Sequence, residues 1–259
     1  MTISITALKK KIAGRGVKIW AVALWLVVWQ LLAMVVDQEI LLVSPVSMLA
    51  RWFELISQAD FWARVAFSSL RIFEGLILGV ALGSVLGVIA ARFQWFKDLM
   101  TPLISVIRAI PVASFIILAL AWVSEKSLSA FISFMICFPV FYTNVLNGAK
   151  SVSPHLVEMG RVFRLSPVKR FRTIFVPTVF PYLKTAFNVS VGLAWKSGTA
   201  AELITVPNGS IGELLHQAKI FLETADNLAW AFTIILLSLL FEGACRLILN
   251  IVERLLKGR

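Results

Sequence analysis

The chain has 259 residues, of which 59% are hydrophobic and 15% are charged, and its mean hydropathy is +0.87. A soluble domain carries roughly 25% charged residues and does not bury so much apolar surface, so the composition indicates a membrane protein. It excludes a disordered chain, a fibre and a disulfide scaffold. The net charge of +11 does not predict a nucleic-acid partner, because the basic residues fall between apolar runs.

Six apolar runs are long enough to cross a membrane as helices. They cover residues 19–36, 72–91, 102–123, 128–148, 183–205 and 228–249. A hydrocarbon core about 30 Å thick needs roughly 20 helical residues, and these runs are too long and continuous for barrel strands. The sequence therefore predicts an all-α, polytopic fold with six transmembrane helices in a single domain, residues 1–259. No cleavage site follows the first run, so we interpret it as a helix rather than a signal peptide.

The distribution of Lys and Arg predicts the orientation. If the N-terminal tail, residues 1–18, is cytoplasmic, most of the basic residues lie on the inside and the outer segments are comparatively acidic. This bias predicts that both termini are cytoplasmic. Two outer segments, residues 45–56 and 211–221, have helical patterns, and Ser44-Pro45 supplies a cap and a first-turn proline for the first of them.

The second span carries four glycines at strict four-residue spacing, which places them on one helix face. They are Gly75, Gly79, Gly83 and Gly87. Small residues at this spacing let another helix approach closely. Two interpretations remain open: tight packing within one subunit, or packing along a dimer or pathway seam.

The segment between the fourth and fifth spans, residues 149–182, is polar and contains two Ser-Pro pairs. Each pair is typical of an N-cap followed by a first-turn proline, so each predicts the start of a short helix. We expect these helices over residues 154–165 and 167–175. Two capped helices under the membrane would form a docking device for a partner.

Two prolines, Pro177 and Pro181, are expected to stop the second short helix and to set the entry into the fifth span. Another interpretation of this segment is a basic loop lying on anionic lipid. Its basic residues are Arg164, Lys169, Arg170 and Arg172.

The first short helix resembles the EAA loop of bacterial ABC importer permeases, and the nearest family is the nitrate/sulfonate/taurine type. The corresponding stretch consists of Val157, Glu158, Met159, Gly160, Arg161, Val162, Phe163, Arg164, Leu165 and Ser166, followed by Phe171 and Val176-Pro177. The resemblance extends from about residue 40 to 250. Its further elements are Ser44-Pro45, Ser69-Leu70-Arg71, Arg108-Ala109-Ile110-Pro111, Gly192-Leu193-Ala194-Trp195 and Ala200-Ala201-Glu202.

This sequence departs from the family pattern at two places in the first short helix and the turn that follows it. Glu158-Met159-Gly160 stands where the family has Glu-Ala-Ala, and Arg164 occupies the position of its usual glycine. Glycine there permits a backbone that other residues disfavour. We expect Arg164 to adopt an ordinary conformation or to be strained.

The resemblance implies a type I ABC importer permease in a bacterial inner membrane. Its partners would be a cytoplasmic ABC ATPase, an extracytoplasmic solute-binding protein, a second copy of the permease and the lipid bilayer. The chain has no Gly-x4-Gly-Lys-Ser/Thr motif, so it is not expected to be an enzyme that hydrolyses ATP. A small solute, such as a sulfonate, nitrate or a vitamin precursor, would pass between two copies.

Polar residues and a proline inside the spans are candidates for the solute path, because burying polar groups in a membrane is costly. They are Arg108, Pro111, Asn188, Lys196 and Glu202. Internal pairing or snorkelling of the charged side chains is the alternative. Arg71 and Glu74, three residues apart, are expected to form a local ion pair.

Other protein classes fit less well. A self-contained secondary transporter or channel would explain the charged residues but not the capped helix pair. An intramembrane protease would need a base beside Ser197, and both histidines lie outside the spans. Cys137 and Cys245 lie within apolar runs and are expected to be buried free thiols, so we expect neither a metal nor a cofactor.

Overall fold

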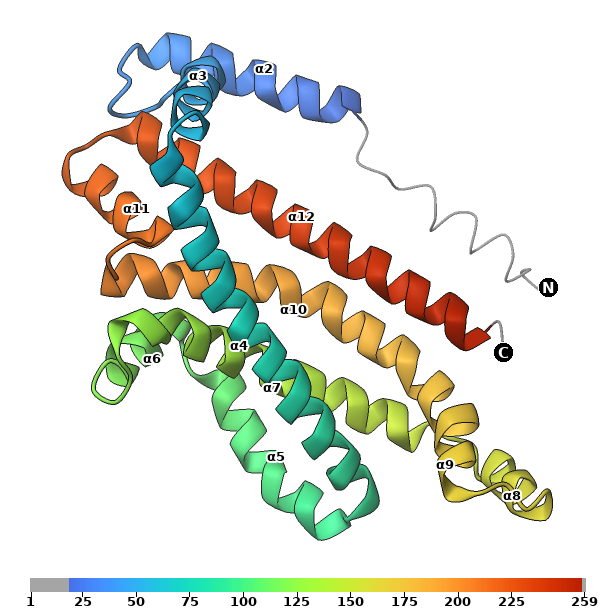
Figure 1. The fold of residues 1–259 in the computed structure, drawn as a ribbon. Helices are drawn as coiled ribbons and strands as arrows, with labels where there is room; N and C mark the ends of the chain where they lie inside the picture. The colour runs from blue at the N-terminus through green and yellow to red at the C-terminus, as the bar shows by residue number, and fades with distance from the viewer. Residues whose placement is uncertain (1–18, 258–259) are drawn as a thin grey trace.

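The computed structural model describes residues 19–257, so the expected cytoplasmic tail, residues 1–18, lies outside the described residues. Over residues 19–257 the chain is helical and contains no strand, which confirms the all-α prediction. The elements are α2 (Ile19–Val36), α3 (Pro45–Ile56), α4 (Ala59–Arg92), α5 (Gln94–Ala109), α6 (Val112–Ala119), α7 (Glu125–Lys150), α8 (Pro154–Val162), α9 (Pro167–Arg170), the π-helix η1 (Phe171–Phe175), α10 (Val176–Thr205), α11 (Ile211–Ile220) and α12 (Thr224–Lys257) (Figure 1).

Three described helices are long and apolar enough to cross a membrane: α4, α7 and α12. The pair formed by α5 and α6 would make a fourth crossing that is bent by 103°. Two of the six expected spans correspond to α2, a shorter apolar helix, and to α10, which carries more polar residues. The number of six spans therefore stays a prediction.

The glycines of α4 lie against α7. A Cβ added at Gly75 would meet the Ala130 carbonyl and would lie 2.8 Å from Ser133 Cβ. Added at Gly79, Gly83 and Gly87, it would lie 2.7 Å from Cys137 Cβ, 2.8 Å from Phe138 O and 2.8 Å from Tyr142 O. Because backbone atoms of α7 cannot move aside as a flexible side chain does, glycine is what permits this approach. The four glycines therefore pack against a helix of the same chain, which agrees with the interpretation of tight packing within one subunit.

A three-helix core of α4, α7 and α10 forms the centre of the molecule. Its buried side chains include Ile72 from α4, Phe141 from α7 and Trp195 from α10. Both cysteines are free, as expected; Cys137 is buried at this core, whereas Cys245 on α12 is only half-buried.

The third expected span is broken. A single helix over residues 102–123 was expected, but α5 ends at Ala109 and α6 begins at Val112, after a bend of 103°. Ile110 and Pro111 are extended, with ψ of 128° and 125°. A residue before proline avoids the helical region, and proline donates no N–H, so the chain leaves the helix for two residues instead of bending through it.

The second short helix was expected to be stopped by Pro177 and Pro181, but neither proline ends it. It continues through η1 directly into α10. The Val176 N–H donates to Phe171 O, one residue further back than in an α-helix, so Pro177 falls in the first turn of α10, where no N–H is needed. Pro181 lies inside α10 and costs it one hydrogen bond.

At the end of the molecule opposite α8 and α9, α3 and α11 are the two helices predicted for residues 45–56 and 211–221 (Figure 1). Ser44 caps α3 by accepting a hydrogen bond from the Ser47 N–H at 3.0 Å. Arg51 of α3 donates to Asp226 of α12 through Nε at 2.5 Å. Hydrogen bonds to Asp226 and then Glu54 raise the pKa of Arg51 above its ordinary value, so this contact stays charged and ties α3 to α12.

Candidate functional site

The segment with α8 and α9 projects beyond the ends of α7 and α10, at the end of the molecule opposite α3 and α11 (Figure 1). Pro154 opens α8 after Ser153, whose side chain makes no capping bond. Ser166 caps α9 by accepting a hydrogen bond from the Lys169 N–H at 3.3 Å. The expected helix pair is therefore present, but α8 ends at Val162 rather than at residue 165.

The turn after α8 has an unusual residue at its left-handed position. The Leu165 N–H donates to Gly160 O and the Arg164 N–H donates to Arg161 O, both at 2.9 Å, which is the pattern of a Schellman motif. Arg164 stands at the position that this motif usually gives to glycine, and its φ is +51°. Of the two expected outcomes, the strained conformation is the one adopted, at a cost of roughly 1 kcal/mol.

Gly160 lets α8 lie directly on the segment that leads into α10. It is buried, and a Cβ there would lie 3.1 Å from Ile174 Cδ1 and 3.2 Å from Arg170 Cγ. Val157, one turn earlier, lines a small hollow with Phe171 and Ile174. The base of α8 is therefore packed against η1, which continues directly into α10.

The outer side of α8 carries apolar side chains that nothing in the described chain covers. Val162 is 80% exposed and Phe163 is 70% exposed, and Met159 is exposed as well. Glu158 is also exposed, and its Oε2 lies 3.9 Å from His155 Nδ1. Arg161, three residues further on, is exposed as well. An apolar tip flanked by charges is typical of a surface that a partner covers.

Arg108, the first of the pathway candidates, holds α5 against α7. Its guanidinium donates to Pro139 O at 2.9 Å and to Thr143 Oγ1 at 2.6 Å. Within residues 19–257 it has no carboxylate partner, so the alternative of an internal salt bridge is not found there.

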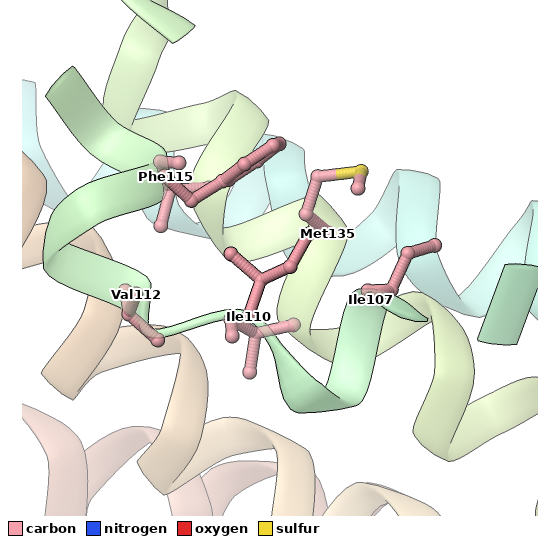
Figure 2. A pocket seen from close by; sticks show the side chains of 7 residues that line it. Ile107, Ile110, Val112, Phe115 and Met135 are labelled. Atoms are coloured by element: carbon pink, nitrogen blue, oxygen red, sulfur yellow. The ribbon is translucent and has the colours of Figure 1, made fainter. Parts of the chain in front are cut away.

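The break at Pro111, three residues after Arg108, encloses a small apolar pocket. Figure 2 shows Ile107, Ile110 and Val112 around it, with Phe115 and Met135 above them. Since all its lining side chains are apolar, the pocket itself offers no group that would bind a charged solute.

Lys196 and Asn188 lie on the same face of α10. Both are exposed, and Gly192 stands between them at four-residue spacing with open space where a Cβ would be. Over residues 19–257, Lys196 forms no ion pair. If α10 crosses the membrane, as the sequence predicts, an ammonium on this face is costly where it meets hydrocarbon.

Glu202 lies inside the protein instead of on that face. Its carboxylate is fully buried and accepts hydrogen bonds from Ser68 Oγ at 2.7 Å and the Gly212 N–H at 3.4 Å. Ser68 in turn accepts from the Ile211 N–H at 3.0 Å. The carboxylate therefore faces the positive end of α11, which stabilises it. Sequence analysis missed Ser68, because nothing in the sequence of α4 points to Glu202, which is 134 residues away.

Comparisons with known proteins place this arrangement in a family. Residues 83–257 match the family described as binding-protein-dependent transport system inner membrane component. The nitrate import permease protein NrtB of Synechocystis is 29% identical over 71% of this chain and 70% of its own length. The aliphatic sulfonates transport permease protein SsuC of Escherichia coli, described as putative, is 28% identical over 76% and 75%. A probable ABC transporter permease of Brucella melitensis is 25% identical over 90% and 94%.

The chain belongs to the family of binding-protein-dependent transport system inner membrane components. It is an ABC importer permease of the nitrate/sulfonate type, a multi-pass membrane subunit of a transport system and not an enzyme. Membership in this family implies an ATPase and a substrate-binding protein as partners.

Proposed function

We propose that this permease couples solute movement to a separate cytoplasmic ATPase through the segment from Val157 to Ser166. The observation that carries the proposal is the exposed apolar tip of α8, Val162 and Phe163, on a helix whose base is packed against η1. The tip supplies the surface that a cleft in the ATPase would cover. The packed base supplies the rigidity needed to transmit its movement.

The continuity of η1 with α10 supports this route for the mechanical signal. A partner that moves α8 also moves the Gly160 contact with Ile174, and α10 continues from η1 without a loop. ATP binding would favour one arrangement of the spans and hydrolysis the other, which is alternating access driven by different affinities for two states.

For the solute path, we propose the face of α10 that carries Asn188 and Lys196, covered by the same face of a second copy. An exposed lysine in mid-span supports this placement, because a water-filled seam between two copies removes the cost of facing lipid. Arg108 and Pro111 would act indirectly, by setting the bend that shapes one wall. Glu202 would position α11 at the outer end of the path.

Small anions are the class of solute that we propose. The ammonium of Lys196, which has no ion-pair partner among residues 19–257, supports an anion, and two of the relatives are described as nitrate and sulfonate permeases. An extracytoplasmic binding protein would deliver the solute at the end with α3 and α11. Both termini would be cytoplasmic, as the distribution of basic residues predicts.

The test is charge reversal at the docking helix. We expect Glu158→Lys to insert normally and to abolish ATP hydrolysis that depends on the binding protein, because the reversed charge faces the partner. Asp98→Lys, the same charge reversal at an exposed carboxylate of α5, is the matched control and should retain hydrolysis. Normal stimulated turnover in the Glu158 variant would remove the support for docking through this segment.

A further inference from the structure

Two hollows lie on the same face of α12. The first is lined by apolar side chains of α4 and α10, among them Phe73, Ile77 and Phe187, and on α12 by Cys245, Ile248 and Leu249. Because Ile77 and Ile248 are largely exposed, nothing in the described chain fills this hollow. It is an apolar recess within the membrane-spanning part of the molecule.

The second hollow follows at the end of α12 that lies near α9. Here α12 contributes Val252, Leu255 and Leu256, while the opposite wall contributes Lys169 and Arg172. The α12 positions of the two hollows recur every three or four residues, so they form one stripe. We call the two hollows together the α12 furrow; its apolar part leads to a cationic part.

Within the described part of the chain, no ion pair neutralises the charge at the second hollow. Over the described residues, Lys169 and Arg172 form no ion pair. Glu253, on the adjacent face of α12, instead accepts a hydrogen bond from Lys184 at 2.7 Å. A phosphate brought to this end would therefore meet two available cations.

We propose that the α12 furrow binds one anionic phospholipid of the cytoplasmic leaflet. Its phosphate would lie at Lys169 and Arg172, and an acyl chain would lie in the apolar hollow. The stripe from Cys245 to Leu256 rises by roughly 16 Å, about half of a 30 Å hydrocarbon core, which is the depth of one leaflet. A free phosphate would use only the cationic end, whereas a phospholipid uses both.

The proposed lipid would also affect coupling. Lys169 and Arg172 belong to the helical segment that joins α8 to α10. A lipid bridging this segment to α12 would hold the base of α8 in place, so we expect coupled ATP hydrolysis to be higher in membranes with anionic lipid. The proposal uses the orientation proposed above, but lipid binding is measured without ATP or the ATPase, so the two can fail separately.

The test is lipid retention by the purified protein. The tagged chain, with the partners that stay bound, is extracted from vesicles of equal parts phosphatidylglycerol and phosphatidylcholine and measured by native mass spectrometry. We expect one retained phosphatidylglycerol per chain. A basic residue near a membrane surface is worth roughly fivefold in affinity, so Lys169→Ser/Arg172→Ser should weaken retention about twenty-five-fold.

The controls separate the furrow from general charge and from misfolding. Arg92→Ser/Lys97→Ser removes the same charge at the turn between α4 and α5 and should retain the lipid. Ala81→Trp fills the apolar hollow with both basic residues intact and should lose it, while Leu82→Trp on the neighbouring face should not.

Four results would overturn the proposal. They are equal loss in the two double-serine variants, equal retention of phosphatidylcholine, displacement of the lipid by inorganic phosphate alone, and full retention in Ala81→Trp. Protection of Leu255→Cys from a thiol reagent only when the ATPase is bound would also overturn it, by assigning the furrow to that partner.

Discussion

Adding one methyl group at Gly75 should loosen the contact between α4 and α7. In Gly75→Ala the new Cβ would meet the carbonyl oxygen of Ala130 and would lie 2.8 Å from Ser133 Cβ. Ordinary carbon–carbon contacts are about 3.5–4.0 Å, so α4 has to move away from α7 by a large part of an ångström. Such a movement also weakens the contacts at Gly79 and Gly83, because all three lie on one rigid helix face.

The expected cost follows from two opposing terms. Overpacking a filled interface costs about 1–3 kcal/mol, and the upper end applies here because a backbone atom is in the way. Alanine contributes about 1 kcal/mol in favour of the helix relative to glycine. The net destabilisation is therefore about 2 kcal/mol. At 2–4 °C per kcal/mol for a chain of this size, Tm should fall by roughly 4–8 °C.

The assay uses the buried thiol at the same interface. In a Cys245→Ser background, a maleimide dye that fluoresces on reaction reports when Cys137, opposite Gly79, becomes accessible on heating in mild detergent. Gly243→Ala on α12 is the matched control, since nothing lies within 4 Å of a Cβ there, and its Tm should be unchanged or slightly higher. A Gly75→Ala protein as stable as the Gly243→Ala protein would refute the reasoning.

Three further predictions concern single side chains. Arg164→Gly should remove the cost of the left-handed turn, so the Leu165 amide should exchange with deuterium roughly fivefold more slowly, as about 1 kcal/mol requires; unchanged exchange would mean that the turn is not strained. Glu202→Ala should lower stability by about 1.5–3 kcal/mol through loss of the bonds from Ser68 and Gly212, while Glu202→Gln should lose less; equal melting of both variants would argue against this anchoring role. Lys196→Met should insert and melt normally but slow uptake of an anionic solute, and unaltered uptake would exclude this lysine from the path.

The helices were predicted well where the sequence carries a local signal. Ser-Pro pairs marked the starts of α3, α8 and α9, and the four-residue glycine spacing identified the packed face of α4. The expected pair of Arg71 and Glu74 is present at 3.4 Å. Each of these features depends on residues within one or two helical turns, so the sequence alone contains the information.

The corrections involve proline, whose effect depends on the surrounding structure. Pro111 breaks the helix completely because Ile110 also leaves the helical region, whereas Pro177 is accommodated by the register shift of η1. Composition could not separate these outcomes, because they depend on which neighbouring N–H and C=O groups remain bonded.

The candidate path could be predicted only in part. Arg108 and Glu202 both read as costly polar groups in apolar runs, yet one bonds the backbone of α7 and the other the start of α11. These partners are 31 and 10 residues away and carry no pattern that points to them. Lys196, by contrast, is exposed on α10, and its exposure depends on how the helices pack against one another.

The central claim is that α8 docks a separate ATPase, and the most direct measurement is affinity purification of the tagged chain from its native membrane in mild detergent, with mass identification of what stays bound. The account predicts a P-loop ATPase in stoichiometric amount, lost in Glu158→Lys and kept in Asp98→Lys. A clean oligomer without any ATPase, under conditions that keep other ABC complexes intact, would contradict it.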